Sequence, residues 1–292
     1  MAAYVTLYSP IVFVAALLAA SGAHAQTLDG RMKKIAETKT ITIAYRNDAA
    51  PFSFLAGGRP DGFSIDLCKR VVGSMERQLR VERLKVNWVP VNVQNRFETV
   101  ASGNADMECG STSMTLARMK QVDFSSVIFV ETTGVLVKTA SGARSFSDLG
   151  GKRIAVVEGT TNERAINANV TRWRLDTKVL PFKSRDEALA AFESGRTDAV
   201  ASDKTILMAV IKKAKDRNAL TLLPDQLSYE PYAIVLPRGD ASLRLAVNTG
   251  LAQLFADGKE INEIVIRWFE PLGKQSSPVL DLVFALGAIP PQ

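Results

Sequence analysis

Histidine is almost missing from this sequence of 292 residues, since His24 is the single one. His24 lies in an N-terminal segment that we expect to be removed, which would leave the mature chain with none. A chain without histidine cannot build a Ser–His–Asp or Cys–His catalytic group or a His-ligated metal site. Cysteine is also scarce, and Cys68 and Cys109 do not have the spacing of a zinc site. The sequence therefore predicts no metal and no cofactor.

The N-terminal apolar run is too short to span a membrane. Ile11–Ala20 is about ten residues long. Residues 1–26 contain no Lys, Arg, Asp or Glu, and Ala23–Ala25 provides the small residues that a leader peptidase reads. We expect residues 1–25 to be a signal peptide that is cut after Ala25 and directs the chain to the periplasm. The segment lacks the usual positive charge, and an anchor that is never cut is the alternative.

The charge of the chain is moderately positive. The net charge is +6 and the pI is about 9.3, but Lys and Arg are scattered and form no long basic run. An exported chain of this kind does not favour nucleic acid as a partner, and its charge suits small anionic ligands. In an oxidising compartment, Cys68 and Cys109 either form a disulfide or remain two buried thiols.

Strand and helix patterns alternate along the chain. Alternating β-branched residues predict a strand at Ile41–Arg46, and apolar spacing predicts a helix over 63–79. The same alternation restarts after long extended stretches at 124–138 and 229–237. We therefore expect an α/β fold of two lobes. One comprises residues 26–133 plus 234–292, the other comprises residues 134–233, and a cleft lies between them.

Hydroxyl residues and one arginine follow a predicted strand at Ser111–Arg118. Backbone N–H groups at such a turn favour an anion, and a guanidinium matches a carboxylate with two parallel hydrogen bonds. Ser111, Ser113 and Arg118 are therefore candidates to bind a small carboxylate. An ordinary turn with a solvated arginine is the alternative.

Two strand ends in the second half of the chain have related chemistry. Thr160 follows Gly159 at the start of a predicted helix, where free N–H groups could meet the same anion. Asp203 ends a later strand and could bind an ammonium group. A carboxylate-binding arginine opposite an ammonium-binding aspartate is what a zwitterionic amino acid requires. For both residues, a plain helix cap is the alternative.

Several phrases in their order resemble the periplasmic solute-binding proteins of the polar amino acid family, which serve ABC transporters. These phrases span residues 40–270: "APFSF", "DGFSIDLCKRV", "NRFETVASGNADM", "GSTSMTLARMKQVDFS", "DLGGKRIAVVEGTTNE", "AAFESGRTDAVASD" and "LAQLFADGKEINEIVIRWF". The phrases "QNRF", "ECGSTS" and "FSSVIFV" resemble the glutamate/aspartate-binding members in particular.

The resemblance implies a type II periplasmic-binding-protein fold, with two crossing strands as its hinge. It assigns the α-carboxylate of a ligand to Ser111, Ser113, Arg118 and Thr160, and the ammonium group to Asp203. It places Arg46 and Arg96 at the side-chain carboxylate, with Arg185 where the family has histidine. Surface ion pairs are the alternative for Arg46 and Arg96.

Departures from the family pattern leave the ligand open. Val93 stands where a serine is expected, the histidine is absent, and the segment after Trp268 differs. Glutamate and aspartate are favoured, with glutamine or another dicarboxylate as alternatives. The resemblance implies membrane permease subunits as partners and a monomer in solution. An exported cyclohexadienyl or arogenate dehydratase, using Glu108 or Glu158, and a ligand sensor for a chemoreceptor are the alternative functions.

Overall fold

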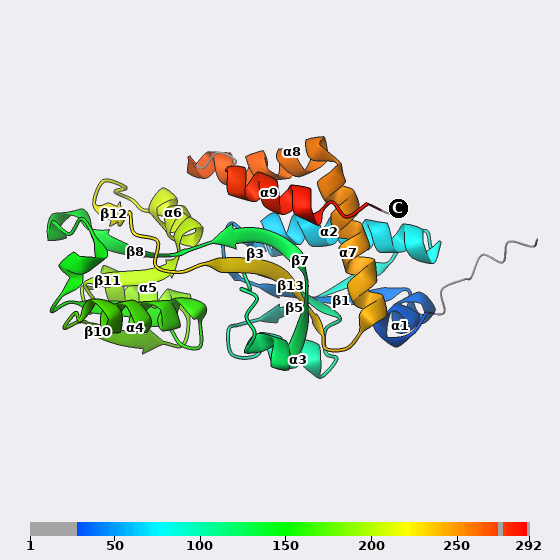
Figure 1. Cartoon of the computed structure of the whole chain (residues 1–292), viewed down its shortest axis with the longest axis horizontal. Coiled ribbons are helices and arrows are strands. Elements are labelled where there is room, and N and C mark those ends of the chain that lie inside the picture. The colour runs from blue at the N-terminus through cyan, green and yellow to red at the C-terminus, as the bar shows by residue number, and fades with distance from the viewer. Residues whose placement is uncertain (1–27, 274–276, 291–292) are drawn as a thin grey trace, which may run out of the picture.

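The computed structural model describes residues 28–273 and 277–290, which form two lobes side by side (Figure 1). The expected signal peptide lies outside these residues. Within the described part of the chain, no helix has the length and apolar character needed to cross a membrane.

The first lobe is built on a mixed five-stranded sheet. In spatial order its strands are β5 (Lys85–Val91), β1 (Thr40–Arg46), β6 (Met107–Cys109), β13 (Glu230–Pro237) and β7 (Val122–Glu131). Strand β1 is parallel to β5 and β6, whereas β13 is antiparallel to β6 and β7. A small antiparallel sheet contains β2 (Asp48–Ala49), β3 (Ser53–Ala56) and β4 (Arg59–Asp61). The helices of this lobe are α1 (Gly30–Thr38), α2 (Phe63–Leu79), α3 (Arg96–Ala101), α7 (Ala241–Ala256), α8 (Gly258–Phe269) and α9 (Pro278–Gly287).

The second lobe repeats the plan on a smaller scale. Its sheet has the order β10 (Lys178–Phe182), β9 (Arg153–Val157), β11 (Ala199–Asp203), β8 (Thr133–Lys138) and β12 (Leu220–Leu222). Its helices are α4 (Thr161–Trp173), α5 (Arg185–Glu193) and α6 (Lys204–Lys213). Short 3₁₀ turns complete the described chain at Arg118–Lys120, Thr139–Ser141, Phe146–Leu149 and Glu270–Leu272.

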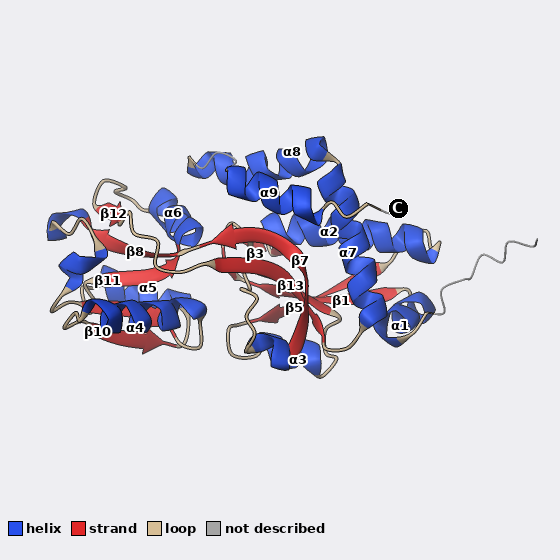
Figure 2. Cartoon of the chain, in the orientation of Figure 1, coloured by secondary structure: helices blue, strands red, loops and turns tan. Residues whose placement is uncertain are grey.

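The chain crosses between the lobes where β7 continues into β8, and it returns along the segment that enters β13 (Figure 2). The extended run expected at 124–138 is two strands, because β7 pairs in the first sheet and β8 in the second. The sheets therefore change at Thr132 and again between β12 and β13. The lobe boundaries expected at 133/134 and 233/234 remain a prediction.

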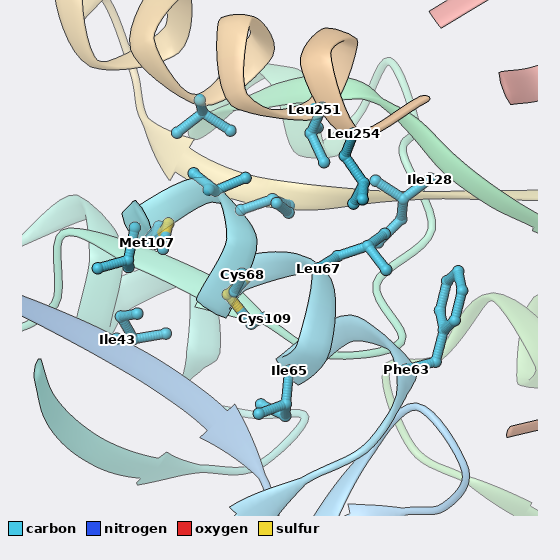
Figure 3. Packing of buried hydrophobic residues seen from close by; sticks show 14 of the residues in the cluster. Ile43, Phe63, Ile65, Leu67, Cys68, Met107, Cys109, Ile128, Leu251 and Leu254 are labelled. Carbon is cyan, nitrogen blue, oxygen red and sulfur yellow. A yellow bond between two sulfur atoms is a disulfide. The ribbon is translucent and has the colours of Figure 1, made fainter. Parts of the chain in front are cut away.

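Period-two alternation explains how the first sheet is buried on both faces. Ile41, Ile43 and Tyr45 of β1 pack into a large core with α2 and α7, and Ala44 faces a second cluster beside α3. A disulfide joins Cys68 of α2 to Cys109 of β6 within the large core (Figure 3). It ties a covering helix directly to the strand that leads into the Ser111–Arg118 segment.

Two helices end at the glycines expected to end them, and one helix break lies at a different residue. Gly103 and Gly195 have positive φ after α3 and α5, as expected for glycines that end helices. Glycine favours a break in a helix, so the sequence predicts one at Gly258, but the break falls one residue earlier. Asp257 separates α7 from α8, because its side chain accepts a hydrogen bond from the Glu260 N–H and so caps the second helix.

Candidate ligand-binding site

A small cavity lies between the lobes and brings all eight predicted site residues together. The first lobe contributes Arg46, Arg96, Ser111, Ser113 and Arg118, and the second contributes Thr160, Arg185 and Asp203. The remaining lining residues are Val93, Thr161 and Asn162. The cavity volume is about 10 Å³, roughly the space that one water molecule needs. A roomier hollow of about 1310 Å³ between α2 and β5 is open to solvent and contains none of these residues. Four arginines and an aspartate converge on the smaller cavity, which makes it the candidate site.

Arg118 is buried and is held by the loop that precedes it. Its Nη1 donates to the Ser113 carbonyl over 2.7 Å, and its backbone N–H donates to Thr115 Oγ1. Its Nε and Nη2 have no hydrogen-bond partner within the described part of the chain. The side chain is 5% exposed, so the alternative of a solvated arginine is wrong. Two free donors of a fixed guanidinium suit a carboxylate.

The start of α4 faces Arg118 from the other lobe. Ser113 Oγ and Thr161 Oγ1 lie 3.2 Å apart and join the two lobes. The Thr160 hydroxyl accepts from the Glu163 N–H and donates to the Val157 carbonyl. Thr160 is thus the N-cap of α4, which was the alternative given for it, and it also lines the cavity. Free N–H groups in the first turn of α4 remain available to an anion.

Asp203 lines the cavity and does not cap the helix that follows it. It precedes α6, but its side chain makes no capping hydrogen bond. Its Oδ1 accepts from Asn162 Nδ2 at 3.1 Å, and its Oδ2 lies 3.9 Å from Arg185 Nη2. The plain-cap interpretation of Asp203 is therefore wrong. A buried carboxylate in this place can receive an ammonium group.

The other arginines differ in how their charges are balanced. Arg46 Nη2 lies 2.7 Å from Asp48 Oδ1, and Arg185 Nη1 lies 3.2 Å from Asp48 Oδ2. Arg96 Nη1 instead donates to Thr112 Oγ1 over 2.9 Å, and its Nε has no partner among the described side chains and backbone. Arg46 and Arg96 are 2% and 3% exposed, so the surface ion pairs proposed as their alternative are wrong.

Burial shifts the pKa values of the charged groups around the cavity. It lowers the pKa of Arg96 to about 9 and that of Arg118 to about 10, and both remain cations at neutral pH. Both guanidinium groups contact the Phe97 ring, whose centroid lies 4.8 Å from the Arg96 guanidinium carbon and 5.3 Å from that of Arg118. Burial also raises the pKa of Glu108, although three neighbouring arginines oppose the shift.

Several contributors to this site were not predicted as such. Thr112 accepts from Arg96 and donates to Glu108 Oε2 over 2.8 Å, so it orients the arginine and does not itself line the cavity. Asn162 and Asp48 hold their charged neighbours. Thr112 is one of the hydroxyl residues at Ser111–Arg118 that were expected to contact an anion directly. The only signal for Asn162 was its position inside the quoted N-cap phrase. Nothing in the sequence pattern marks Asp48.

The fold and the cavity together define a two-lobed binding cleft for a small charged molecule. Residues 41–271 match the family of bacterial extracellular solute-binding proteins, family 3, and the chain belongs to this family. Solved proteins of the same type II fold share its architecture. They include an ancestral amino acid-binding protein, a precursor of cyclohexadienyl dehydratase. It is 27% identical with a TM-score of 0.70, and the match covers 82% of this chain and all of the other.

Two relatives of similar length are named as glutamate/aspartate-binding proteins. An L-glutamate/L-aspartate-binding protein of Pseudomonas aeruginosa is 36% identical over 88% of this chain and 85% of its own length. A glutamate/aspartate import solute-binding protein of Salmonella typhimurium is 28% identical over 91% of this chain and 88% of its own length. The resemblance expected from the sequence is confirmed.

Proposed function

We propose that the chain is an extracytoplasmic solute-binding protein that captures an acidic amino acid for uptake by an ABC transporter. Three buried arginines at the cavity, Arg46, Arg96 and Arg118, have Nε atoms without a partner among the described residues. The observation that carries this proposal is that Arg46 is paired with Asp48, whereas Arg96 and Arg118 make no ion pair within the described part of the chain and lie beside the buried Asp203. A buried charge without a counter-ion is costly. A ligand with two carboxylates and one ammonium group would satisfy Arg96, Arg118 and Asp203. The names of both relatives support the same ligand class.

The mechanism follows from the small size of the closed cavity. An amino acid is far larger than the space of one water molecule, so the lobes separate to admit it. The two hinge segments, around Thr132 and before β13, allow this motion. Contacts from both lobes then stabilise the closed form around the ligand. Arg118 with Ser111, Ser113 and the start of α4 at Thr160 would bind the α-carboxylate, Asp203 the ammonium group, and Arg96 with Arg46 and Arg185 the distal end.

A thermal-shift screen of the twenty amino acids and common dicarboxylates tests this assignment. Ligand at about 100 times its Kd stabilises the native state by about 2.7 kcal/mol, which raises Tm by roughly 5–11 °C in a protein of this size. We expect glutamate and aspartate to give the largest shifts. If basic or apolar amino acids alone raise Tm, the acidic ligand is wrong. If only glutamine or another neutral polar amino acid does, the family function stands and the distal assignment is wrong.

We propose that the chain binds its ligand without turning it over. A dehydratase would need an acid at the ligand, but Glu108 does not line the cavity and Glu158 is exposed. Incubation with prephenate, followed by ultraviolet absorbance, tests this point, and product formation would contradict it. Co-purification with permease subunits, as opposed to a chemoreceptor, separates transport from sensing.

We also propose that residues 1–25 are removed on export to the periplasm and that the mature chain acts as a monomer. Mass spectrometry of protein recovered from the periplasm gives the cleavage site directly. Size-exclusion chromatography with light scattering gives the oligomeric state. An intact N-terminus or a stable dimer would contradict the respective expectation.

A further inference from the structure

Asp48 binds two of the four arginines that line the cavity. It lies two residues after Arg46, at the start of β2, and its Oδ1 is 2.7 Å from Arg46 Nη2. Its Oδ2 is 3.2 Å from Nη1 of Arg185, which comes from the other lobe. Arg185 Nη1 also donates to the Asp48 backbone carbonyl. One carboxylate of the protein therefore bridges two guanidinium groups across the cleft.

The charge of Asp48 is maintained by these arginines. Burial acts to raise the pKa of Asp48, but the charges of Arg185 and Arg46 outweigh it and hold the pKa below its ordinary value. The group is thus a carboxylate at neutral pH. A carboxylate that bridges two guanidinium groups occupies the kind of position in which the distal carboxylate of an acidic ligand would bind.

We propose that Asp48 is a specificity-determining residue, a resident carboxylate that takes up the charge of Arg46 and Arg185 and leaves Arg96 as the cation for the distal group of the ligand. The inference rests on the proposed function, because it concerns how that site distinguishes a carboxylate from an amide. It predicts that Asp48 repels the distal carboxylate and so limits the preference for glutamate over glutamine.

Besides its charge near the distal group of the ligand, Asp48 affects the closure of the two lobes, and the experiment must separate these two effects. Its pairing with Arg185 links the two lobes, so its loss weakens the closed form for every ligand. Glutamate and glutamine have nearly the same shape and differ in one charge. A change in closure therefore lowers both affinities by the same factor and cancels in their ratio, whereas a change in local charge alters the ratio.

The test is calorimetric titration of the full mature chain and of Asp48→Asn with glutamate and with glutamine. Glutamine is measured by competition against glutamate if its direct signal is weak. Asp61→Asn is the matched control, since Asp61 lies in β4, pairs with Lys69 and does not line the cavity. Asp48→Ser is a second variant in case the first folds poorly, and circular dichroism checks the fold of each.

We expect the ratio of the glutamine Kd to the glutamate Kd to rise about tenfold or more in Asp48→Asn, because the variant removes a negative charge near the distal carboxylate and a tenfold change in this ratio needs only about 1.4 kcal/mol. The control should leave the ratio unchanged. If both affinities fall by the same factor, Asp48 only links the lobes and the inference is wrong; a falling ratio also overturns it. A wild-type chain that binds neither ligand would instead refute the proposed function.

Discussion

Arg96 should be a residue whose removal stabilises the free protein while weakening its binding. The proposed change is Arg96→Met, which keeps much of the volume and deletes the charge. Burial lowers the pKa of Arg96 from the ordinary value of a guanidinium to about 9, which corresponds to a cost of about 5 kcal/mol for keeping the cation inside the protein. The variant also loses the Thr112 hydrogen bond and the Phe97 contact, which together offset about 3 kcal/mol of this gain.

The net expectation without ligand is a gain of about 2 kcal/mol, or a rise in Tm of about 4–8 °C. Ligand binding should instead be weaker in the variant. A charge-assisted hydrogen bond to the ligand contributes about 1.5–3 kcal/mol, and a ligand carboxylate that is left unpaired adds a further cost. The glutamate Kd should rise about 100-fold, and the glutamine Kd about threefold or less.

The assay combines thermal melts without ligand and calorimetry with both ligands. Arg244→Met is a control, because Arg244 is on α7, is largely exposed and pairs with Asp123 far from the cavity. A lower Tm of the free variant would show that Arg96 is already satisfied in the protein. Equal losses for glutamate and glutamine would remove Arg96 from the distal end of the ligand.

Four further predictions concern other parts of the site and its support. Arg118→Ala should weaken glutamate and glutamine equally, by about 100-fold or more, because both lose the α-carboxylate contact; calorimetry that finds a loss for glutamate alone would contradict this. Asp203→Asn should weaken amino acids but spare glutarate, which has no ammonium group, and a matching loss for glutarate would make Asp203 structural. Replacing Cys68 and Cys109 by Ala opens a link with a sequence separation of 41 residues and should cost about 4 kcal/mol in denaturant unfolding; an unchanged midpoint would refute it. Because the pKa of Glu108 is raised, the native state holds its proton more tightly, and wild-type stability should fall relative to Glu108→Gln as pH rises above 4.5; parallel unfolding curves at pH 4.5 and 7.5 would show otherwise.

The fold was predictable where a local signal and the tertiary environment agree. The alternation in β1 matches a strand buried on both faces, and glycines with positive φ end α3 and α5. The predicted break between α7 and α8 is wrong by one residue. Glycine is a common sign of a helix break, whereas the sequence alone does not show that the Asp257 carboxylate caps α8. The sequence pattern does not place the segment after Trp268, which differs from the family pattern. Its helix α9 begins at Pro278 after the Ser277 cap, and its position depends on packing of Leu280 and Phe284 against the large core, which no local pattern encodes.

The charged residues of the site could be predicted from the sequence, but the ion pairs that they form could not. Strand ends and the resemblance placed Arg46, Arg96, Arg118 and Arg185 around one cleft, and the structure brings all four to the same cavity. By our inference, which of them is free for a ligand depends on Asp48, a residue in a turn-rich stretch whose carboxylate lies 3.2 Å from Nη1 of Arg185 in the other lobe. A sequence pattern identifies the cationic residues. Only the fold shows which of them are paired with a carboxylate of the protein. We therefore expect the ligand preference of this cleft to depend on the carboxylate of Asp48 as much as on the arginines that line the cavity.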